Sequence, residues 1–265
     1  MNAGTKAGVS AVTVVLAVVG AAAMTGTAAS AAAIGIDQLR TQGEAITHGV
    51  TGVKSIDVEV GAADLTIRYG DGVDARLESD GGDLRGWSLD ASGRTLEVRG
   101  PNRGFNWFIP DWFRDERPVT LVLPASLEGS DLKASLQAGA LTIDGSFGGV
   151  VTTVDAGSLV VDGGASTVDV TVNAGRADIS LDGVRTAKFT ISAGKLVSEL
   201  TAVPDEVSFE VNAGDLTLTL PDAEYDLRRD VSLGSLNSDL TQVPGASHRI
   251  DGKVAAGGAK LLRGR

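Results

Sequence analysis

The sequence predicts an all-β protein, a single-chain β-solenoid or β-helix with rungs of about 18–20 residues. A short pattern carries this prediction: an aliphatic and a polar residue precede Ala-Gly, and alternating apolar residues follow, as in VNAGRADIS and VNAGDLTLT. A fixed period near 20 is typical of a stack in which each repeat buries its apolar face on its neighbours. The central glycines of the copies are Gly139, Gly157, Gly175, Gly194, Gly214, Gly234 and, in a looser copy, Gly257.

The residues on either side of Ala-Gly are expected to form strands. Val168, Val170 and Val172 alternate with polar residues, and this period of two places one side of the strand inside. Two strands and two corners fill a rung of this length at about 3.3 Å per residue. An antiparallel meander is the structural alternative. The solenoid is favoured because the same small-residue corner recurs with the same flanks, whereas a meander would alternate two turn types.

Each central glycine is predicted to mark a corner, where a positive φ or a close backbone approach excludes a side chain. Asp-Gly pairs that close several repeats, such as Asp144-Gly145, are expected to turn the chain again. A degenerate first copy occupies residues 56–69, with Ala63 in the glycine position.

The solenoid is expected to span residues 51–265. Residues 51–125 form an atypical first part with an aromatic insert at 101–118, and regular repeats fill residues 126–265. Because open ends of a stack invite aggregation, we expect the atypical part to cover one end and the basic tail at 260–265 to blunt the other.

The first 36 residues are predicted to be a signal peptide or a signal-anchor helix, followed by a linker at 37–50. Residues 9–24 (VSAVTVVLAVVGAAAM) are apolar, and Lys6 is the only charge before Asp37. A signal peptide would be cleaved near Ala29-Ser30-Ala31, whereas an anchor would cross the bilayer as a transmembrane helix of about 20 residues. Both interpretations place the bulk of the chain outside the cytoplasm, membrane-anchored or secreted.

The composition excludes several classes of function. With 34 acidic and 23 basic residues the formal net charge is -11, which argues against nucleic acid as a partner. The chain has no Cys, which excludes disulfides, a thiolate nucleophile and Cys-based metal sites.

Two alternative functions would require metal binding or catalysis. A calcium-stabilised surface roll is suggested by aspartates at strand ends, but the nonapeptide GGxGxDxUx of calcium-binding rolls is absent. A polysaccharide-active β-helix enzyme would need two carboxylates in a cleft and aromatic platforms. Instead, Phe147, Phe189, Phe209 and Tyr225 are spaced like core positions, and His48 and His248 lack metal-ligand spacing. We therefore expect no enzymatic activity, no catalytic residue, no metal and no cofactor.

One segment breaks the pattern, PNRGFNWFIPDWFRDERP at 101–118. Its prolines forbid a long helix or a central strand. It is expected to cap the solenoid end with Trp87 beneath it, since large aromatic residues are mostly buried. The alternative is an exposed loop that contacts the membrane interface or a partner. The contact residues would be Phe105, Trp107, Phe108, Trp112 and Phe113, five of the chain's eleven aromatic residues.

Three stretches carry a resemblance to a known family: VKSIDVEVGAADLTIRYGDG at 53–72, VTLVLPASLEG at 119–129 and LPDAEYDL at 220–227. With the repeated AGxL corners, they make residues 51–262 similar to the bacterial putative-adhesin β-strand-repeat family, a domain of unknown function. The resemblance implies a non-enzymatic β-solenoid outside a bacterial membrane, often anchored through an N-terminal helix. It further implies an adhesin-like or envelope-stress-related role with an unknown envelope or surface partner, and it supplies no catalytic residue.

Overall fold

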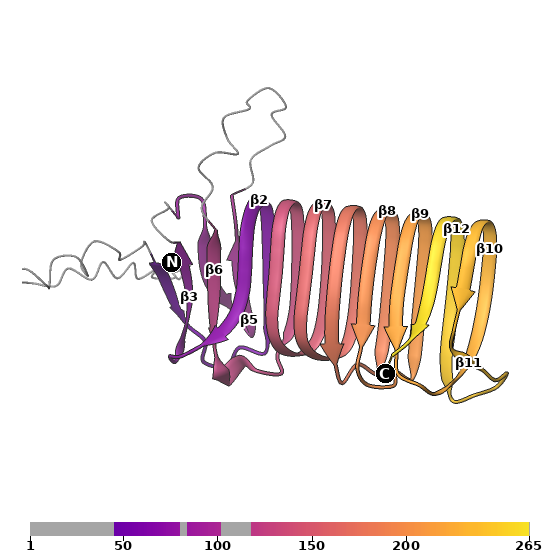
Figure 1. The fold of residues 1–265 in the computed structure, drawn as a ribbon. Coiled ribbons are helices and arrows are strands. Elements are labelled where there is room, and N and C mark those ends of the chain that lie inside the picture. Colours follow the sequence, from indigo (N-terminus) through magenta and orange to yellow (C-terminus); the bar gives the residue numbers. More distant parts are fainter. Residues whose placement is uncertain (1–44, 80–83, 102–117, 265) are drawn as a thin grey trace, which may run out of the picture.

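The computed structural model describes residues 45–79, 84–101 and 118–264, and in these ranges the protein is all-β. One sheet of twelve strands winds into a stack of coils (Figure 1). The strands are β1 (Ala45–Gly49), β2 (Ser55–Gly70), β3 (Asp74–Ser79), β4 (Ser88–Ser92), β5 (Thr95–Arg99), β6 (Val119–Pro124), β7 (Asp131–Asp182), β8 (Thr186–Leu200), β9 (Glu206–Leu220), β10 (Glu224–Ser238), β11 (Thr241–Gln242) and β12 (His248–Arg263). A short 3-10 helix, η3 (Ala125–Leu127), precedes β7.

The coils pair in parallel, which confirms the solenoid prediction and excludes the antiparallel meander. β2 pairs with the start of β7, the end of β7 with β8, and β8 with β9, each through both legs of the coil. β7 runs for 52 residues without a break. Within the coils, alternate apolar side chains such as Val168, Val170 and Val172 are buried, and they join one core that extends from Val50 to Leu261.

The predicted signal or transmembrane helix at 1–36 lies outside the described residues. Among the residues that the structure does describe, no helix is long and apolar enough to cross a membrane.

Short strands close the N-terminal end of the stack, at the indigo end of Figure 1. On one leg of β2 they follow in the order β6, β3 and β1, and the last two pairings are antiparallel. On the other leg lie β5 and then β4, which pair antiparallel with each other. Residues 45–49 were expected to be linker and instead form strand β1. Their apolar pattern is weak, and β3 supplies the partner that holds them.

At the C-terminal end, the order of the coils in space differs from their order in the sequence. β12 pairs with β9 on one side and with β10 on the other, so the last strand of the chain lies inside the stack. The prediction that residues 260–265 blunt this end is therefore wrong for the described residues 260–264. β10 is the last coil, and β11 pairs only with its base, at Glu224 and Tyr225.

Side-chain size explains this inverted order. Phe209 of β9 is buried, and Gly252 of β12 lies beside it, where a Cβ would come within 2.3 Å of the Phe209 ring. The residue of β10 in the same row is Arg229. An arginine at an inward-facing position is tolerated only where the stack ends and its guanidinium reaches the surface.

Candidate interaction surface

The predicted corner glycines lie in one column along the bend of the coils. The structure gives a φ between +112° and +148° to Gly139, Gly157, Gly175, Gly194 and Gly214. A Cβ on Gly175 would lie 2.0 Å from the carbonyl oxygen of Gly157, and the other members of the column meet the same obstacle. Gly234, in the terminal coil, is outside the positive-φ group. The column presents closely stacked backbone to solvent and no reactive side chain.

A polar ladder runs beside this column. The Asn173 side chain donates to Asp155 Oδ1 at 2.8 Å, and Ser192 Oγ donates to Asn173 Oδ1 at 3.2 Å. Each bond joins neighbouring coils, because the residues are 18 and 19 positions apart in the sequence. The ladder therefore satisfies polar groups between coils and holds the bend in register.

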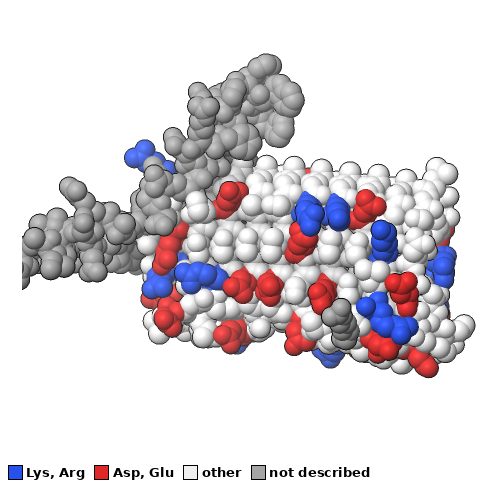
Figure 2. Space-filling view, viewed as in Figure 1, with Lys and Arg blue, Asp and Glu red and all other residues white. Residues whose placement is uncertain are grey.

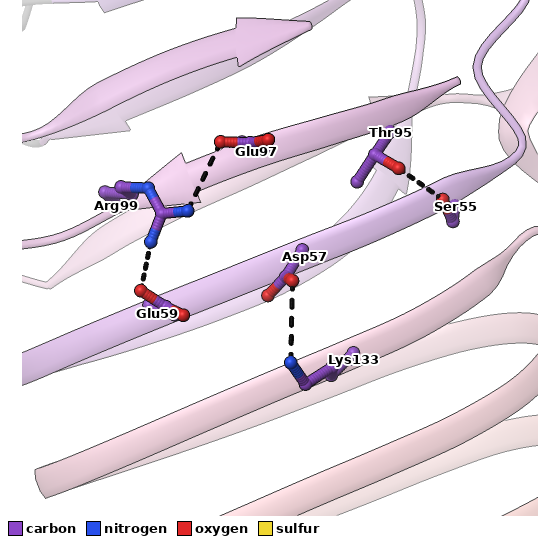
Figure 3. Close-up of polar contacts among 7 residues, drawn as sticks. All are labelled: Ser55, Asp57, Glu59, Thr95, Glu97, Arg99 and Lys133. Atoms are coloured by element: carbon purple, nitrogen blue, oxygen red, sulfur yellow. Dashed lines mark hydrogen bonds and ion pairs between the residues drawn. The ribbon is translucent and has the colours of Figure 1, made fainter. Parts of the chain in front are cut away.

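The walls carry ion pairs that also join neighbouring coils. Lys133 Nζ lies 3.6 Å from Asp57 of β2, and Arg99 binds both Glu59 and Glu97 (Figure 3). The hydrogen bond that Arg99 donates to Glu97 is the main reason that the pKa of Arg99 is raised, and the charge of Glu59 adds to it. Figure 2 shows acidic and basic side chains interspersed along one wall. Exposed pairs of this kind contribute little stability, about 0–1 kcal/mol each.

A shallow pocket of about 460 Å³ lies where β12 enters the stack. Both of its arginines lie beside carboxylates: Arg228 is 3.3 Å from Asp226, and Arg249 is 3.6 Å from Glu206. The loop at 245–247 forms the rest of its wall. The pocket offers polar contacts without a nucleophile–base pair.

The two histidines lie at opposite ends of the stack. His48 is on β1, whereas His248 begins β12. His248 Nδ1 donates a 2.9 Å hydrogen bond to the Pro204 carbonyl oxygen, and its ring packs near Tyr225. Within the described ranges, no group of three or more His, Asp or Glu side chains is placed to hold a metal ion.

The predicted contact residues Phe105, Trp107, Phe108, Trp112 and Phe113 lie outside the described residues, so their role stays a prediction. Trp87, expected beneath them, is buried, and its ring lies close to Gly100. The aromatic residues Phe147, Phe189, Phe209 and Tyr225 are buried in the core, as their spacing predicted.

The outer edge of β10, residues 226–238, is a surface that sequence reasoning missed; we call it the open edge. Leu233 is 80% exposed and Val231 is 37% exposed at its bend. No described strand pairs with β10 on its outer side beyond Tyr225. One signal in the sequence could have revealed it, because Arg229 occupies a row whose other members face inward.

Comparison with known proteins gives distant structural likenesses and one family. No curated protein matches the chain. A crystal structure described as a "putative cell adhesion protein" from Clostridium sporogenes is 10% identical, with a TM-score of 0.39, over 84% of this chain and 100% of that one. A "putative adhesin" from Bacteroides fragilis is 14% identical, with a TM-score of 0.37, over 83% of this chain and 95% of that one. The Toastrack DUF4097 family model matches residues 53–195, more than half of the sequence, and the chain belongs to this family.

Proposed function

We propose that this chain is a non-enzymatic, extracytoplasmic β-solenoid that acts at the bacterial cell surface as an adhesin-like or envelope-stress-related interaction protein. One observation carries the proposal: a continuous aliphatic core fixes every outward side chain of the coils in register. Solenoids of this kind offer extended, rigid surfaces that suit binding of another macromolecule. The burial of the core aromatics leaves none of them to form a carbohydrate platform on the coils.

The apolar segment at 9–24 supports an extracytoplasmic location, as a cleaved signal or as a membrane anchor. The aromatic segment at 105–113, expected to cap the solenoid end, is in the alternative interpretation the contact element for the envelope partner, because Trp and Phe are enriched where proteins meet partners or membrane interfaces.

Co-sedimentation of purified residues 38–265 with bacterial envelope fragments tests this function, because the apolar segment at 9–24 would by itself carry the full-length chain into a membrane pellet. The wild type is expected to pellet with the fragments, and Trp107→Ala/Trp112→Ala is expected to remain in the supernatant. The matched control is Asp169→Ala/Lys188→Ala, which removes an exposed 3.0 Å ion pair from the wall between β7 and β8. This control is expected to pellet like the wild type.

Three results would count against the proposal. Failure of the wild type to pellet would overturn envelope binding. Loss of binding in the wall variant alone would move the contact from the aromatic segment to the coils. A lower thermal midpoint of the tryptophan variant with unchanged binding would show that the segment is a structural cap.

A further inference from the structure

We infer that the first leg of the open edge, residues 226–231, binds an extended segment of another protein as an added parallel strand. The segment is identified by its chemistry: its outward residues are a cation, an anion and a cation in that order, and its inward residues are mainly apolar. The inference is independent of the proposed function. It rests on unpaired backbone groups, on inward rows that are incompletely covered, and on the charges of the leg.

The backbone of this leg can pair on its outer side. The Val243 amide donates to the Tyr225 carbonyl oxygen at 2.9 Å, and β11 runs parallel to β10 there. Successive residues of a strand direct their backbone groups to opposite sides, so those of Leu227, Arg229 and Val231 point outward as well. Because the pairing with β11 reaches only Tyr225, no described strand continues along this row of donors and acceptors. An added strand would extend the line that β11 begins.

Two inward rows of this leg are less covered than the same rows in the rest of the stack. Leu227 is only partly buried, although Ile250 of β12 and Val207 of β9 in its row are fully buried. Val231 is 37% exposed, whereas Val254 in its row is fully buried. Apolar side chains of an added strand would cover Leu227 and Val231, and this burial favours binding.

The outward charges of the leg indicate which strand fits. On the inner side, each of them opposes a charge of the other sign on β12. The opposed pairs are Asp226 with Arg249, Arg228 with Asp251, and Asp230 with Lys253. Arg228 and Asp230 are also exposed, and unlike charges directly opposite stabilise paired strands. A cation, an anion and a cation on the added strand would therefore repeat on the outer side the match that β12 makes on the inner side.

Arg229 explains why a single strand fits better than another coil. It occupies an inward row at the open end of the stack, and its guanidinium donates to Gln242 Oε1 at 2.6 Å. A complete coil would close this end and bury the guanidinium, which is costly without a compensating charge. A strand on the first leg alone leaves the space between the two legs open to water, as β11 does at the base of the same edge.

Binding of a synthetic peptide to the full-length chain in detergent solution tests the inference. The probe, RIDTKVAA, follows residues 249–256 of β12 but has Thr in the place of Gly252. The Thr prevents the probe from replacing β12 itself, because a Cβ at Gly252 would come within 2.3 Å of the Phe209 ring. The matched probe DIRTKVAA has the same composition and net charge, with the first cation and the anion exchanged.

Fluorescence anisotropy of the labelled probes measures each dissociation constant. RIDTKVAA is expected to bind about tenfold more tightly than DIRTKVAA, because two favourable charge pairs become two repulsive ones. Equal binding of the two probes would overturn the charge match, and a wild type that binds neither probe would refute the inference.

Two variants of the chain localise the charge match. Asp230→Lys is expected to weaken binding of RIDTKVAA at least about fivefold, because a cation then opposes the lysine of the probe. Asp215→Lys is the matched control, since it changes the net charge equally at an exposed position of β9, away from the open edge. It is expected to bind like the wild type, and an equal loss in both variants would contradict a contact at Asp230.

Hydrogen-exchange mass spectrometry gives the location of the bound probe. At saturating concentration, RIDTKVAA is expected to slow amide exchange in residues 226–231 and to leave residues 235–238 of the second leg unchanged. Equal protection of both legs, or protection of neither, would overturn the added strand.

Discussion

At the bend of each coil, the close approach of neighbouring backbones requires glycine. At Gly175 a side chain would meet both an unfavourable φ of +130° and the Gly157 carbonyl oxygen. The positive φ alone costs about 1–2 kcal/mol for a residue with a Cβ. Removing the clash with the carbonyl oxygen requires two paired coils to move apart.

We predict that Gly175→Ala lowers the free energy of unfolding by about 3 kcal/mol or more. Asp169→Ala, which removes an exposed ion pair with Lys188, should cost about 0.2–1 kcal/mol. Urea denaturation of both variants measures the difference. Equal destabilisation would contradict the view that the coil spacing leaves no room for a Cβ.

Two buried hydroxyl groups lack hydrogen-bond partners in the described structure, those of Thr152 and Ser198. Thr152→Val replaces one of them with a methyl group of similar shape. We expect this variant to be about 1 kcal/mol more stable, because an unsatisfied buried hydroxyl loses its hydration without compensation. Thr153→Val, at the neighbouring outward position, is the control and should change the thermal midpoint little. A lower midpoint for Thr152→Val would indicate that the hydroxyl has a partner after all.

Tyr225 makes stability depend on alkaline pH. Burial, together with the charge of Asp222, raises its pKa to about 12. Since an unfolded tyrosine titrates near pH ~10, the stabilising contribution is complete below that value and falls as pH rises from about 10 to 12. Tyr225→Phe also loses the 2.9 Å hydrogen bond to the Pro221 carbonyl. The stability gap between wild type and variant should therefore narrow above pH ~10 in urea titrations, and a constant gap would argue against a buried phenol.

At the scale of elements, the insertion of β12 between β9 and β10 holds the C-terminal coils together. β10 depends on β12 for its parallel pairing from Tyr225 to Ser238, and β9 depends on it along its outer edge. The Gly264 amide also donates to the Leu220 carbonyl at 2.7 Å and so ties the chain end to β9.

We predict that truncation after Ser247 removes hydrogen-exchange protection from both β9 and β10 and leaves β2 and the first half of β7 protected. The physical reason is that each coil of a solenoid is stabilised mainly by its immediate neighbours. Removal of the last two residues alone is the control, and it should alter protection only near Leu220. Retained protection in β10 after the longer truncation would show that β10 can pair directly with β9.

At the scale of the whole molecule, the two ends of the stack are unlike. Antiparallel strands close the N-terminal end, whereas β10 has a described neighbour on one side only along most of its length. An unpaired edge frays more readily than an interior coil, because its amides are exposed to water and it lacks one packing interface.

We predict a gradient of amide exchange along the stack. β7, with coils on both sides, should exchange slowest, and the bend of β10 around Leu233 should exchange fastest. Hydrogen-exchange mass spectrometry measures this. Uniform exchange along the stack would contradict the gradient.

The sequence by itself determined the coil. Alternation at Val168, Val170 and Val172 fixed which side faces inward, and the recurring Ala-Gly at Gly175 and its equivalents fixed the bend. These features are local, because period-two alternation and the need for a missing Cβ depend on the backbone of one coil and its nearest neighbour. The strand β1 escaped prediction, since five residues with little apolar pattern gain their structure from pairing with β3.

Only the tertiary structure decided which coil lies beside which. Every coil carries nearly the same pattern, so parallel pairing of β9 with β10 or with β12 satisfies alternation and glycine register equally well. The choice came from long-range packing: the Phe209 ring needs the space that Gly252 leaves, and Arg229 needs an end where its charge stays in water. The open edge follows from that choice, because the order of coils determines which strand lacks a neighbour.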